Sequence, residues 1–266
     1  MILLESVKMR DVPENEGFPF TVPVIKNLGE LRFETPVTIF IGENGTGKST
    51  LLEGIAASIN SITIGGDDIG KDETLSHARR LAKHMILVWK FKSQRGFFLR
   101  AEDFFNFSKM LNKTRKEMEV EIERVKTEYE GHSKLAQDLA KAPFVSSIAA
   151  MESRYGTDLD GRSHGESFMQ LFKARFVPNG FYILDEPEAP LSPVRQLALI
   201  AMMKDMVEQG CQFLIATHSP ILMAYPGATI LSLDDIPLKK ITFDEIEHVK
   251  LLRAFLNDPD NYLRRL

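Results

Sequence analysis

Apolar residues recur along the chain in two patterns, short continuous runs and helical spacing, and together these outline its elements. Short β-like runs at 3–7, 20–25 and 31–33, separated by Pro, Gly and Asn, predict an N-terminal antiparallel meander. Residues 37–41 are apolar or β-branched without alternation, which is typical of a strand buried on both faces. A further strand is predicted at 85–88.

The last third of the chain alternates apolar runs with a helical pattern. Strands are predicted at 181–184, 213–217 and 229–233, and a helix at 193–209. Such alternation is typical of strands joined by helical crossovers. The sequence therefore predicts an α/β fold with a mainly parallel central sheet and an N-terminal antiparallel β subdomain.

Between these parts lies a charge-dense segment with apolar residues spaced three and four apart. This spacing predicts an amphipathic helix, and it is carried by Met118, Ile122, Val125, Tyr129, Ala136 and Leu139. We expect Gly131 to break the helix and Pro143 to end it. Residues 104–150 are thus predicted to be a helical hairpin inserted into a single domain of residues 1–266.

Composition narrows the class of protein. The chain has 266 residues, of which 44% are hydrophobic and 26% charged, as in an ordinary globular domain. The net charge of −4 gives no global positive field to attract nucleic acid. A lone cysteine, Cys211, fits a reducing compartment, and no apolar run approaches the ~18 residues of a membrane helix. We therefore expect a cytoplasmic protein without direct membrane insertion.

The strongest motif follows the buried strand at 37–41. Residues 42–49 read Gly-Glu-Asn-Gly-Thr-Gly-Lys-Ser and match G-x-x-x-x-G-K-[ST], between a strand and an amphipathic helix. Backbone amides of such a loop bind a polyphosphate. Lys48 is expected to reach the β- and γ-phosphates, and Ser49 to bind Mg²⁺. The other residues expected to bind nucleotide here are Asn44, Gly45, Thr46, Gly47 and Thr50.

Three further polar features follow in the second half of the chain. Asp185 and Glu186 end an apolar strand, where Asp185 is expected to bind Mg²⁺ and Glu186 to act as a general base, unless the pair only starts a polar loop. His218 ends the next strand, and it either hydrogen bonds a γ-phosphate or is structural. Ser163 and Glu166 form a capping-box pattern, and that helix N-terminus, with Gly165, is a candidate anion site.

Taken together, these motifs resemble those of ABC-type P-loop ATPases. Residues 42–50 look like the Walker A motif, 181–186 like Walker B with its catalytic glutamate, 163–167 like the signature and His218 like the switch histidine. Residues 185–192 and 216–220 resemble the SMC, RecF and OLD-like branch. Residues 96–102, 163–168 and 255–259 are similar to those of small stand-alone bacterial ATPases. The resemblance covers nearly the whole chain except the insertion at about 107–150. It implies a P-loop NTPase fold with ATP and Mg²⁺ as ligands.

The resemblance also implies roles for residues outside these loops. It implies an ATP-dependent head-to-tail homodimer in which Ser163 and Gly165 of one copy contact the γ-phosphate held by the other. Gln94 is the candidate Q-loop residue that contacts Mg²⁺ or the attacking water. Arg100 and Glu102 either act together with Gln94 or form a surface ion pair. Phe18, Phe20 and Phe33 are candidates for stacking on adenine; the alternative is that their rings belong to the hydrophobic core.

Three functions are consistent with these motifs. The leading hypothesis is an ATPase that hydrolyses ATP and uses dimer closure to drive an unidentified protein partner. The second is an ATP-gated DNA-binding clamp, for which the insertion offers the basic residues Lys109, Lys113, Arg115, Lys116, Arg124 and Lys126. Acidic residues interleave with them, however, and a mixed-charge solvated face explains the run more simply. The third hypothesis is the ATPase subunit of a membrane transporter.

Overall fold

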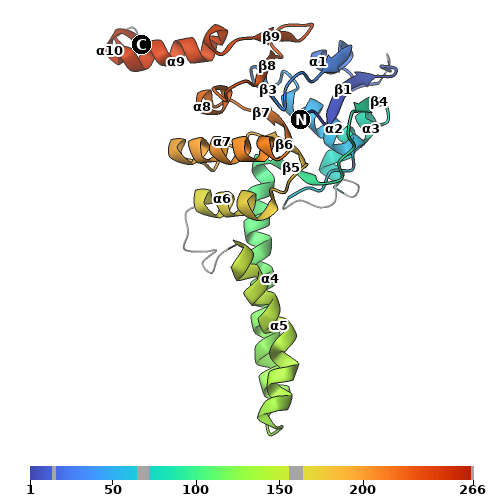
Figure 1. Ribbon diagram of the computed structural model, residues 1–266, viewed down its shortest axis with the longest axis vertical. Coiled ribbons are helices and arrows are strands. Elements are labelled where there is room, and N and C mark those ends of the chain that lie inside the picture. The colour runs from blue at the N-terminus through green and yellow to red at the C-terminus, as the bar shows by residue number, and fades with distance from the viewer. Residues whose placement is uncertain (14–15, 65–71, 156–163, 265–266) are drawn as a thin grey trace.

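The fold is built around a six-stranded sheet with a smaller antiparallel sheet beside it (Figure 1). A computed structural model describes residues 1–13, 16–64, 72–155 and 164–264. The large sheet has the order β5-β6-β7-β3-β8-β9. Its strands are β5 (Gly96–Arg100), β6 (Phe181–Asp185), β7 (Gln212–Ala216), β3 (Val37–Ile41), β8 (Thr229–Ser232) and β9 (Lys239–Ile241).

Five of these strands are parallel, and only β9 pairs antiparallel with β8. Every residue of β3, β6 and β7 is buried, because helices or the small sheet cover both faces of the large sheet. The predicted mainly parallel α/β sheet is therefore confirmed. The glycine-rich loop at 42–47 follows β3, a central strand of this sheet, as in a P-loop fold.

The small sheet has the order β2-β1-β4 and is antiparallel. It contains β1 (Leu4–Met9), β2 (Glu30–Arg32) and β4 (Met85–Trp89). The strand predicted at 20–25 is wrong, because α1 (Pro23–Lys26) is a short helix with Pro23 in its first turn. Proline has no N–H to lose at that position and its φ suits a helix. The apolar residues that suggested a strand, Val24 and Ile25, are buried from this helix instead.

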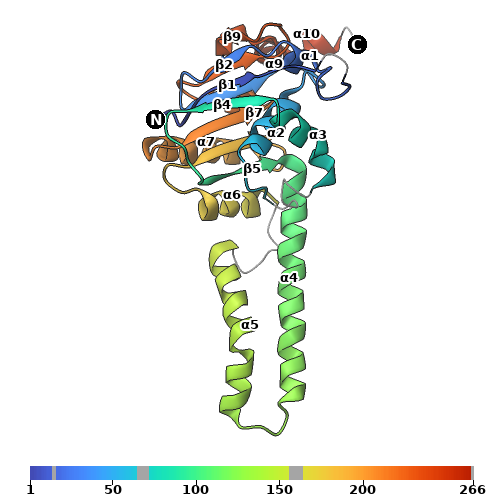
Figure 2. The same ribbon diagram turned by 90° about the vertical axis from the view of Figure 1, so that its right-hand side faces the viewer.

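Helices fill the two layers on either side of the large sheet. On one face α2 lies against the strands and packs with α3 and β4 beneath the small sheet (Figure 2). On the other face α6 and α7 pack on the sheet, and Phe168, Leu171 and Phe172 of α6 are fully buried. The bounds are α2 (Lys48–Ser58), η1 (Glu73–Leu75), α3 (Ser76–Ala82), α6 (His164–Arg175), α7 (Pro193–Glu208) and α8 (Pro220–Met223).

The charge-dense insertion is a helical hairpin that projects away from both sheets (Figures 1 and 2). Its helices are α4 (Ala101–Glu128) and α5 (Lys134–Tyr155), and Gly131 with φ of 87° lies in the turn between them. The expectation that Pro143 ends the helix is wrong, since it lies inside α5. Packing along α4 outweighs the one backbone hydrogen bond that proline removes, and Ser146 and Ser147 donate their hydroxyls to its carbonyl.

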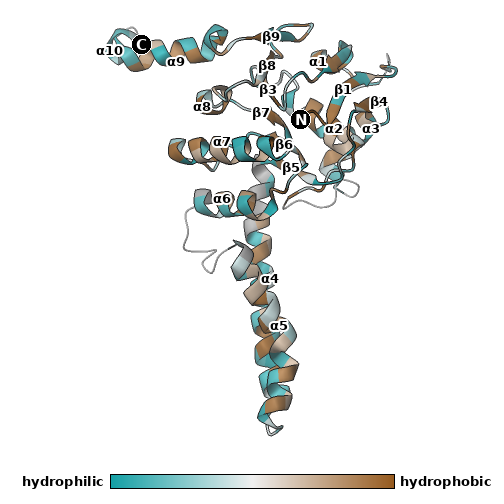
Figure 3. Cartoon of the chain, viewed as in Figure 1, coloured by the Kyte–Doolittle hydropathy of each residue, from teal (hydrophilic) through white to brown (hydrophobic). Residues whose placement is uncertain are grey.

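The surface of the hairpin alternates polar and apolar residues along both helices (Figure 3). Four of its basic residues lie within 4 Å of a carboxylate on the same helix, as i,i+3 or i,i+4 pairs. These pairs are Lys113–Glu117, Arg115–Glu119, Arg124–Glu121 and Lys126–Glu123. The cations and anions therefore offset one another locally, as expected for a solvated face.

The C-terminal residues extend from the large sheet beyond β9 (Figure 1). The elements there are η2 (Phe243–Glu245), α9 (Glu247–Asn257) and α10 (Pro259–Leu263). Ile246 and Val249 are buried against the sheet, whereas Leu251 and Leu256 are exposed. The root of α9 is thus anchored while the rest of the helix faces solvent.

A buried glutamine joins the two sheets. The Oε1 atom of Gln212 accepts from the backbone N–H groups of Leu3 and Leu4, both at 2.8 Å, and its Nε2 donates to the Leu4 carbonyl at 3.0 Å.

We predict that Gln212→Leu lowers the free energy of unfolding by about 2–4 kcal/mol, because it leaves buried backbone groups unpaired. Chemical denaturation measures this. Gln209→Leu, at the exposed position directly after α7, is the control and is expected to change stability by less than about 0.5 kcal/mol. An equal effect of the two substitutions would contradict the role of Gln212.

Candidate functional site

The loop between β3 and α2 has the backbone of a phosphate cradle. Gly42, Gly45 and Gly47 have φ of 147°, 87° and 98°, which side-chain-bearing residues rarely adopt. A Cβ atom on Gly47 would also lie 2.5 Å from Val22 and 2.7 Å from Val24. The first amides of α2, as in any helix, have no acceptor within the helix. The loop therefore offers backbone N–H groups and the positive end of a helix dipole to an anion.

Lys48 is held at the centre of this loop. Only 5% of the residue is exposed, and its Nζ donates to the carbonyls of Gly42 at 2.7 Å and Glu43 at 2.9 Å. Burial lowers the pKa of Lys48, while the nearby carboxylates of Glu186 and Asp185 act in the opposite direction. An ammonium group has three N–H donors, so two bonds to the loop leave the third for a phosphate oxygen.

Asp185 lies at the end of β6 and is 7% exposed. Burial raises the pKa of its carboxyl to about 7, with a further increase from the nearby charges of Glu53 and Glu186, and hydrogen bonding by the Ser49 hydroxyl opposes this shift. Its Oδ1 atom is buried without a hydrogen-bond partner. A buried carboxylate oxygen of this kind is poorly stabilised by the protein alone.

These oxygens fit Mg²⁺. The ion prefers oxygen ligands and is usually held by one or two protein groups together with substrate phosphates and water. Asp185 Oδ1 and the hydroxyl of the exposed Ser49 are such a pair beside the phosphate loop. Among the residues that the structure describes, no group of three or more His, Cys, Asp or Glu side chains forms a metal site. Two oxygen donors beside the phosphate loop suit a metal that arrives with a phosphate ligand.

Glu186 and His218 face one another across the ends of two adjacent strands. The distance between His218 Nε2 and Glu186 Oε1 is 3.8 Å, and both side chains are partly exposed. Glu186 has φ of 49°, a left-handed conformation that is unfavourable for a residue with a side chain. Its backbone N–H donates to the Ala216 carbonyl of β7 at 2.9 Å. The sheet thus holds a strained backbone that directs a carboxylate toward His218.

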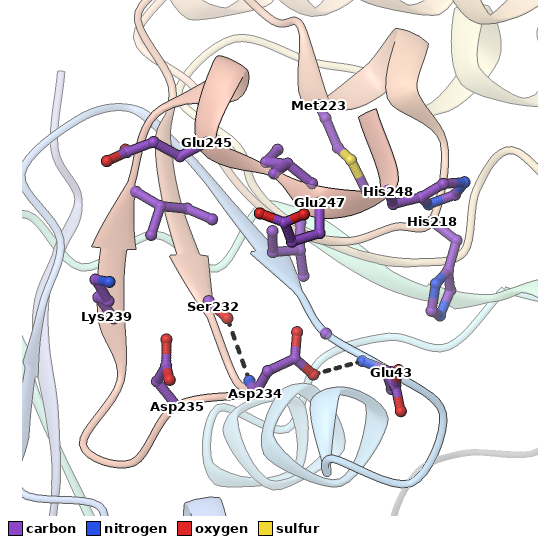
Figure 4. A pocket seen from close by; sticks show the side chains of 14 residues that line it. Glu43, His218, Met223, Ser232, Asp234, Asp235, Lys239, Glu245, Glu247 and His248 are labelled. Atoms are coloured by element: carbon purple, nitrogen blue, oxygen red, sulfur yellow. Dashed lines mark hydrogen bonds between the residues drawn. The ribbon is translucent and has the colours of Figure 1, made fainter. Parts of the chain in front are cut away.

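Several acidic residues of the site lack a sequence motif. Asp234, just beyond β8, accepts a hydrogen bond from the Glu43 amide at 2.8 Å (Figure 4). It lines a cavity of about 510 Å³ beside the phosphate loop, which His218 and α9 also border. Glu188 accepts hydrogen bonds from the backbone of the His218 loop. Glu53 lies one helical turn beyond Ser49 and its charge acts on Asp185. The only sequence signal for them was their proximity to strand ends or to the phosphate loop.

The structure does not place Gln94 with the metal-binding candidates. Gln94 precedes β5 by two residues and lines a pocket with Met1 and Asn179. In the parallel pairing of β5 with β6, Gly96 lies opposite Phe181 and Arg100 opposite Asp185. Gln94 is therefore at the amino edge of the sheet, the edge opposite to Asp185, and its expected contact with Mg²⁺ is wrong.

Arg100 occupies the position beside Asp185 instead, and it is not in a surface ion pair. It is 8% exposed, and its Nε and Nη2 donate to the two carboxylate oxygens of Asp103, both at 2.8 Å. Nη2 also donates to Asp72 at 3.2 Å, and Nη1 lies 3.9 Å from Glu53. Glu53 in turn contacts His77 at 2.7 Å. A buried charge network thus connects the end of β5 with α2 and the root of α4.

Two of the three aromatic candidates for adenine stacking belong to the core. Phe20 is 2% exposed and Phe33 is 3% exposed, and both pack beneath the small sheet. Phe18 is 52% exposed and contacts the His77 ring at a centroid distance of 5.0 Å. Only Phe18 among the three therefore presents a ring surface that a base could reach.

The signature candidates are partly outside the described residues. Ser163 lies outside them, and Gly165 belongs to the first turn of α6. The next acidic residue, Glu166, forms an ion pair with Arg195 at 2.9 Å. Ser192 occupies the N-cap position of α7, although its side chain makes no capping hydrogen bond. The ion pair between Glu166 and Arg195 thus joins α6 to α7.

A protein-family model described as an AAA domain matches residues 24–158, just over half of the chain. The chain belongs to this AAA domain family. It is an ABC-type P-loop ATPase, with the phosphate loop, parallel sheet and acidic strand end described above. The matched span runs through both helices of the hairpin, contrary to the expectation that residues 107–150 lie outside the family resemblance.

This ATPase is also similar to proteins named for ABC transporters. A Bacillus cereus protein, named as an ABC transporter ATP-binding protein, is 24% identical over 233 residues, covering 82% of this chain. The aligned region spans only 36% of that relative's length.

Solved ABC transporter structures are similar as well. One is an ATP-binding cassette of an ABC transporter in its ADP conformation, at 16% identity, with 97% and 96% of the two chains covered and a TM-score of 0.47. Another is cbiO1 from Clostridium perfringens, part of the transporter complex cbiONQ, at 15% identity, full coverage of both chains and a TM-score of 0.45. Family membership rests on the sequence match rather than on these scores.

The described helices of the ATPase lack the features of a membrane span. Within residues 1–13, 16–64, 72–155 and 164–264, none combines the length and the apolar character needed to cross a bilayer.

The raised pKa of Asp185 generates a stability prediction. Ionising this carboxyl in the folded protein costs free energy, so its contribution to stability falls as pH rises from about 4 to about 7. We predict that Asp185→Asn, without Mg²⁺, raises the free energy of unfolding on the order of 1–3 kcal/mol at pH 8 and by much less at pH 5. Chemical denaturation at both pH values measures this, with the exposed Asp205→Asn as the control. A gain that is equal at both pH values would contradict the assignment.

Proposed function

We propose that this ATPase binds Mg-ATP at the carboxyl edge of its large sheet and hydrolyses the γ-phosphate with water. The observation that supports this most strongly is the buried, unpartnered Oδ1 of Asp185 beside Ser49 and Lys48. A buried carboxylate and a buried ammonium group next to the glycine-rich loop fit a ligand that carries both a positive and a negative charge. The polyphosphate of a nucleotide with its metal is such a ligand.

In this proposal each residue of the phosphate loop binds or orients the substrate. The amides of Asn44 to Thr50 bind the phosphates, and the third N–H of Lys48 reaches the β- and γ-phosphate oxygens. Ser49 and Asp185 would hold Mg²⁺, which when bound offsets negative charge on the phosphates. The remaining chemistry is the attack of water.

Glu186 is proposed as the group that orients this water and accepts its proton. Its carboxylate is partly exposed at the strand end and lies next to His218, within reach of a molecule above the loop. His218 Nε2 is buried without a hydrogen-bond partner, so an N–H at this position is free to donate to a γ-phosphate oxygen. A general base and a polar group that contacts phosphate thus come from adjacent strands.

We further propose that two copies close head to tail around two Mg-ATP molecules. The support is the order of motifs in the sequence, in which Ser163 and Gly165 precede the acidic end of β6. The positive end of α6 would then face the γ-phosphate held by the other copy. Closure of this kind would drive a protein partner.

A second candidate function is that of an ATPase subunit in a membrane transporter. The name of the Bacillus cereus relative favours it. Purification from membranes with and without detergent tests it, since a subunit would copurify with a membrane-spanning protein. A DNA-binding clamp gains no comparable support, because carboxylates pair with four of the six basic residues offered by the hairpin.

The proposed role of Glu186 is tested by Glu186→Gln. An amide cannot take the proton of the attacking water, so ATP should remain bound and hold the dimer together. We predict that turnover falls by 10²-fold or more and that the mass in solution doubles only with Mg-ATP. Light scattering and phosphate release measure these, and Lys48→Ala is the control that should remain a monomer. Unchanged turnover together with an unchanged mass would contradict the proposal.

A further inference from the structure

The carboxylate of Glu188 joins the loop after β6 to the loop after β7. Its Oε1 accepts from the backbone N–H of His218 at 2.7 Å and from that of Ser219 at 3.1 Å. Glu188 lies two residues beyond Glu186, and His218 follows β7 by two residues. One oxygen atom therefore connects the loop of the candidate base to the backbone of the candidate phosphate-contacting residue.

Other hydrogen bonds stabilise the same pair of loops without touching His218. Gln196 donates to the Leu191 carbonyl at 3.0 Å, and its Oε1 accepts from the Ser219 hydroxyl. The Ser219 N–H has a second acceptor in the Thr217 hydroxyl at 2.9 Å. Among the residues that the structure describes, Glu188 is the group that accepts from the His218 amide. The position of His218 thus depends on Glu188 more directly than the position of Ser219 does.

The His218 side chain has little else to orient it. Its Nε2 has no hydrogen-bond partner within the described chain, and the nearest carboxylate oxygen, on Glu186, is 3.8 Å away. About 35% of the side chain is exposed. The imidazole is consequently placed by its own backbone, and Glu188 holds that backbone in relation to Glu186.

We propose that Glu188 is a positioning residue for the ATPase reaction and acts through His218. This rests on the proposed function, because it assumes that His218 contacts the γ-phosphate. The Oε2 atom of Glu188 is buried and unpartnered, an arrangement that does not maximise stability. The carboxylate also contributes to the negative charge that favours the ionised form of Lys48.

Two substitutions separate hydrogen bonding from charge. Glu188→Gln keeps one oxygen that can accept from both amides, whereas Glu188→Ala removes the acceptor. Gln196→Ala is the matched control, because it weakens the same pair of loops through Ser219 and leaves the His218 amide bonded. Hydrogen exchange of the His218 amide is read in all three proteins without nucleotide, so this readout does not require ATPase activity.

We expect the His218 amide to exchange at least tenfold faster in Glu188→Ala, and at close to the wild-type rate in Glu188→Gln and Gln196→Ala. With Mg-ATP, kcat should fall 10- to 100-fold in Glu188→Ala while KM changes less than threefold, and Glu188→Gln should restore most of kcat. In a His218→Ala background, Glu188→Ala should have no further effect on kcat.

Three results would overturn the proposal: a protected His218 amide in Glu188→Ala, a loss of kcat that adds in full to that of His218→Ala, or an equal loss in Gln196→Ala. A wild-type protein without ATPase activity would instead contradict the proposed function. The exchange measurement would still decide whether Glu188 positions His218.

Discussion

Parallel pairing of three strands brings all the reactive groups to one level of the large sheet. Ala216 at the end of β7 pairs with Asp185 of β6 on one side and with Phe40 of β3 on the other. Asp185 ends β6, and Glu186, His218 and the glycine-rich loop that contains Lys48 follow the three strands. All of them therefore start from one row of backbone hydrogen bonds. A one-residue slip of β6 would move Asp185 along this row and reverse the face to which its side chain points. The fully buried strands, with different side chains packed on each face, hold this register.

Burial of opposite charges at that row is unfavourable for the protein alone and favourable for its proposed ligand. Lys48 and Asp185 are each almost inaccessible, and burial shifts the pKa of each toward its neutral form. Polyphosphate would stabilise the ammonium group, and Mg²⁺ would stabilise the carboxylate. The positive φ of Glu186 adds backbone strain at the same place. Such local destabilisation is typical of a binding site. The two hydrophobic cores on either side of the sheet stabilise the fold and offset it.

Local patterns in the sequence predicted the elements that depend on local chemistry. The strand, glycine loop and helix around Lys48, the acidic end of β6 and the hairpin with its turn at Gly131 are all present. Errors arose where tertiary contacts decide the outcome. Pro143 lies within a helix because α5 packs on α4, and Gln94 was assigned by distance along the chain, which does not specify the edge of the sheet. The contacts of Glu188 with His218 and of Arg100 with Asp72 join residues about 30 positions apart, so no local pattern indicated them.

The central claim is that Lys48, Ser49 and Asp185 together hold a metal-bound nucleotide. A crystal structure of the protein with Mg²⁺ and a non-hydrolysable ATP analogue tests it most directly. The account predicts the phosphates over the amides of the loop, Lys48 still bonded to the Gly42 and Glu43 carbonyls while reaching the phosphates, and the metal between Ser49 and Asp185. Nucleotide bound away from this loop, or in the loop with the metal remote from both Ser49 and Asp185, would contradict it.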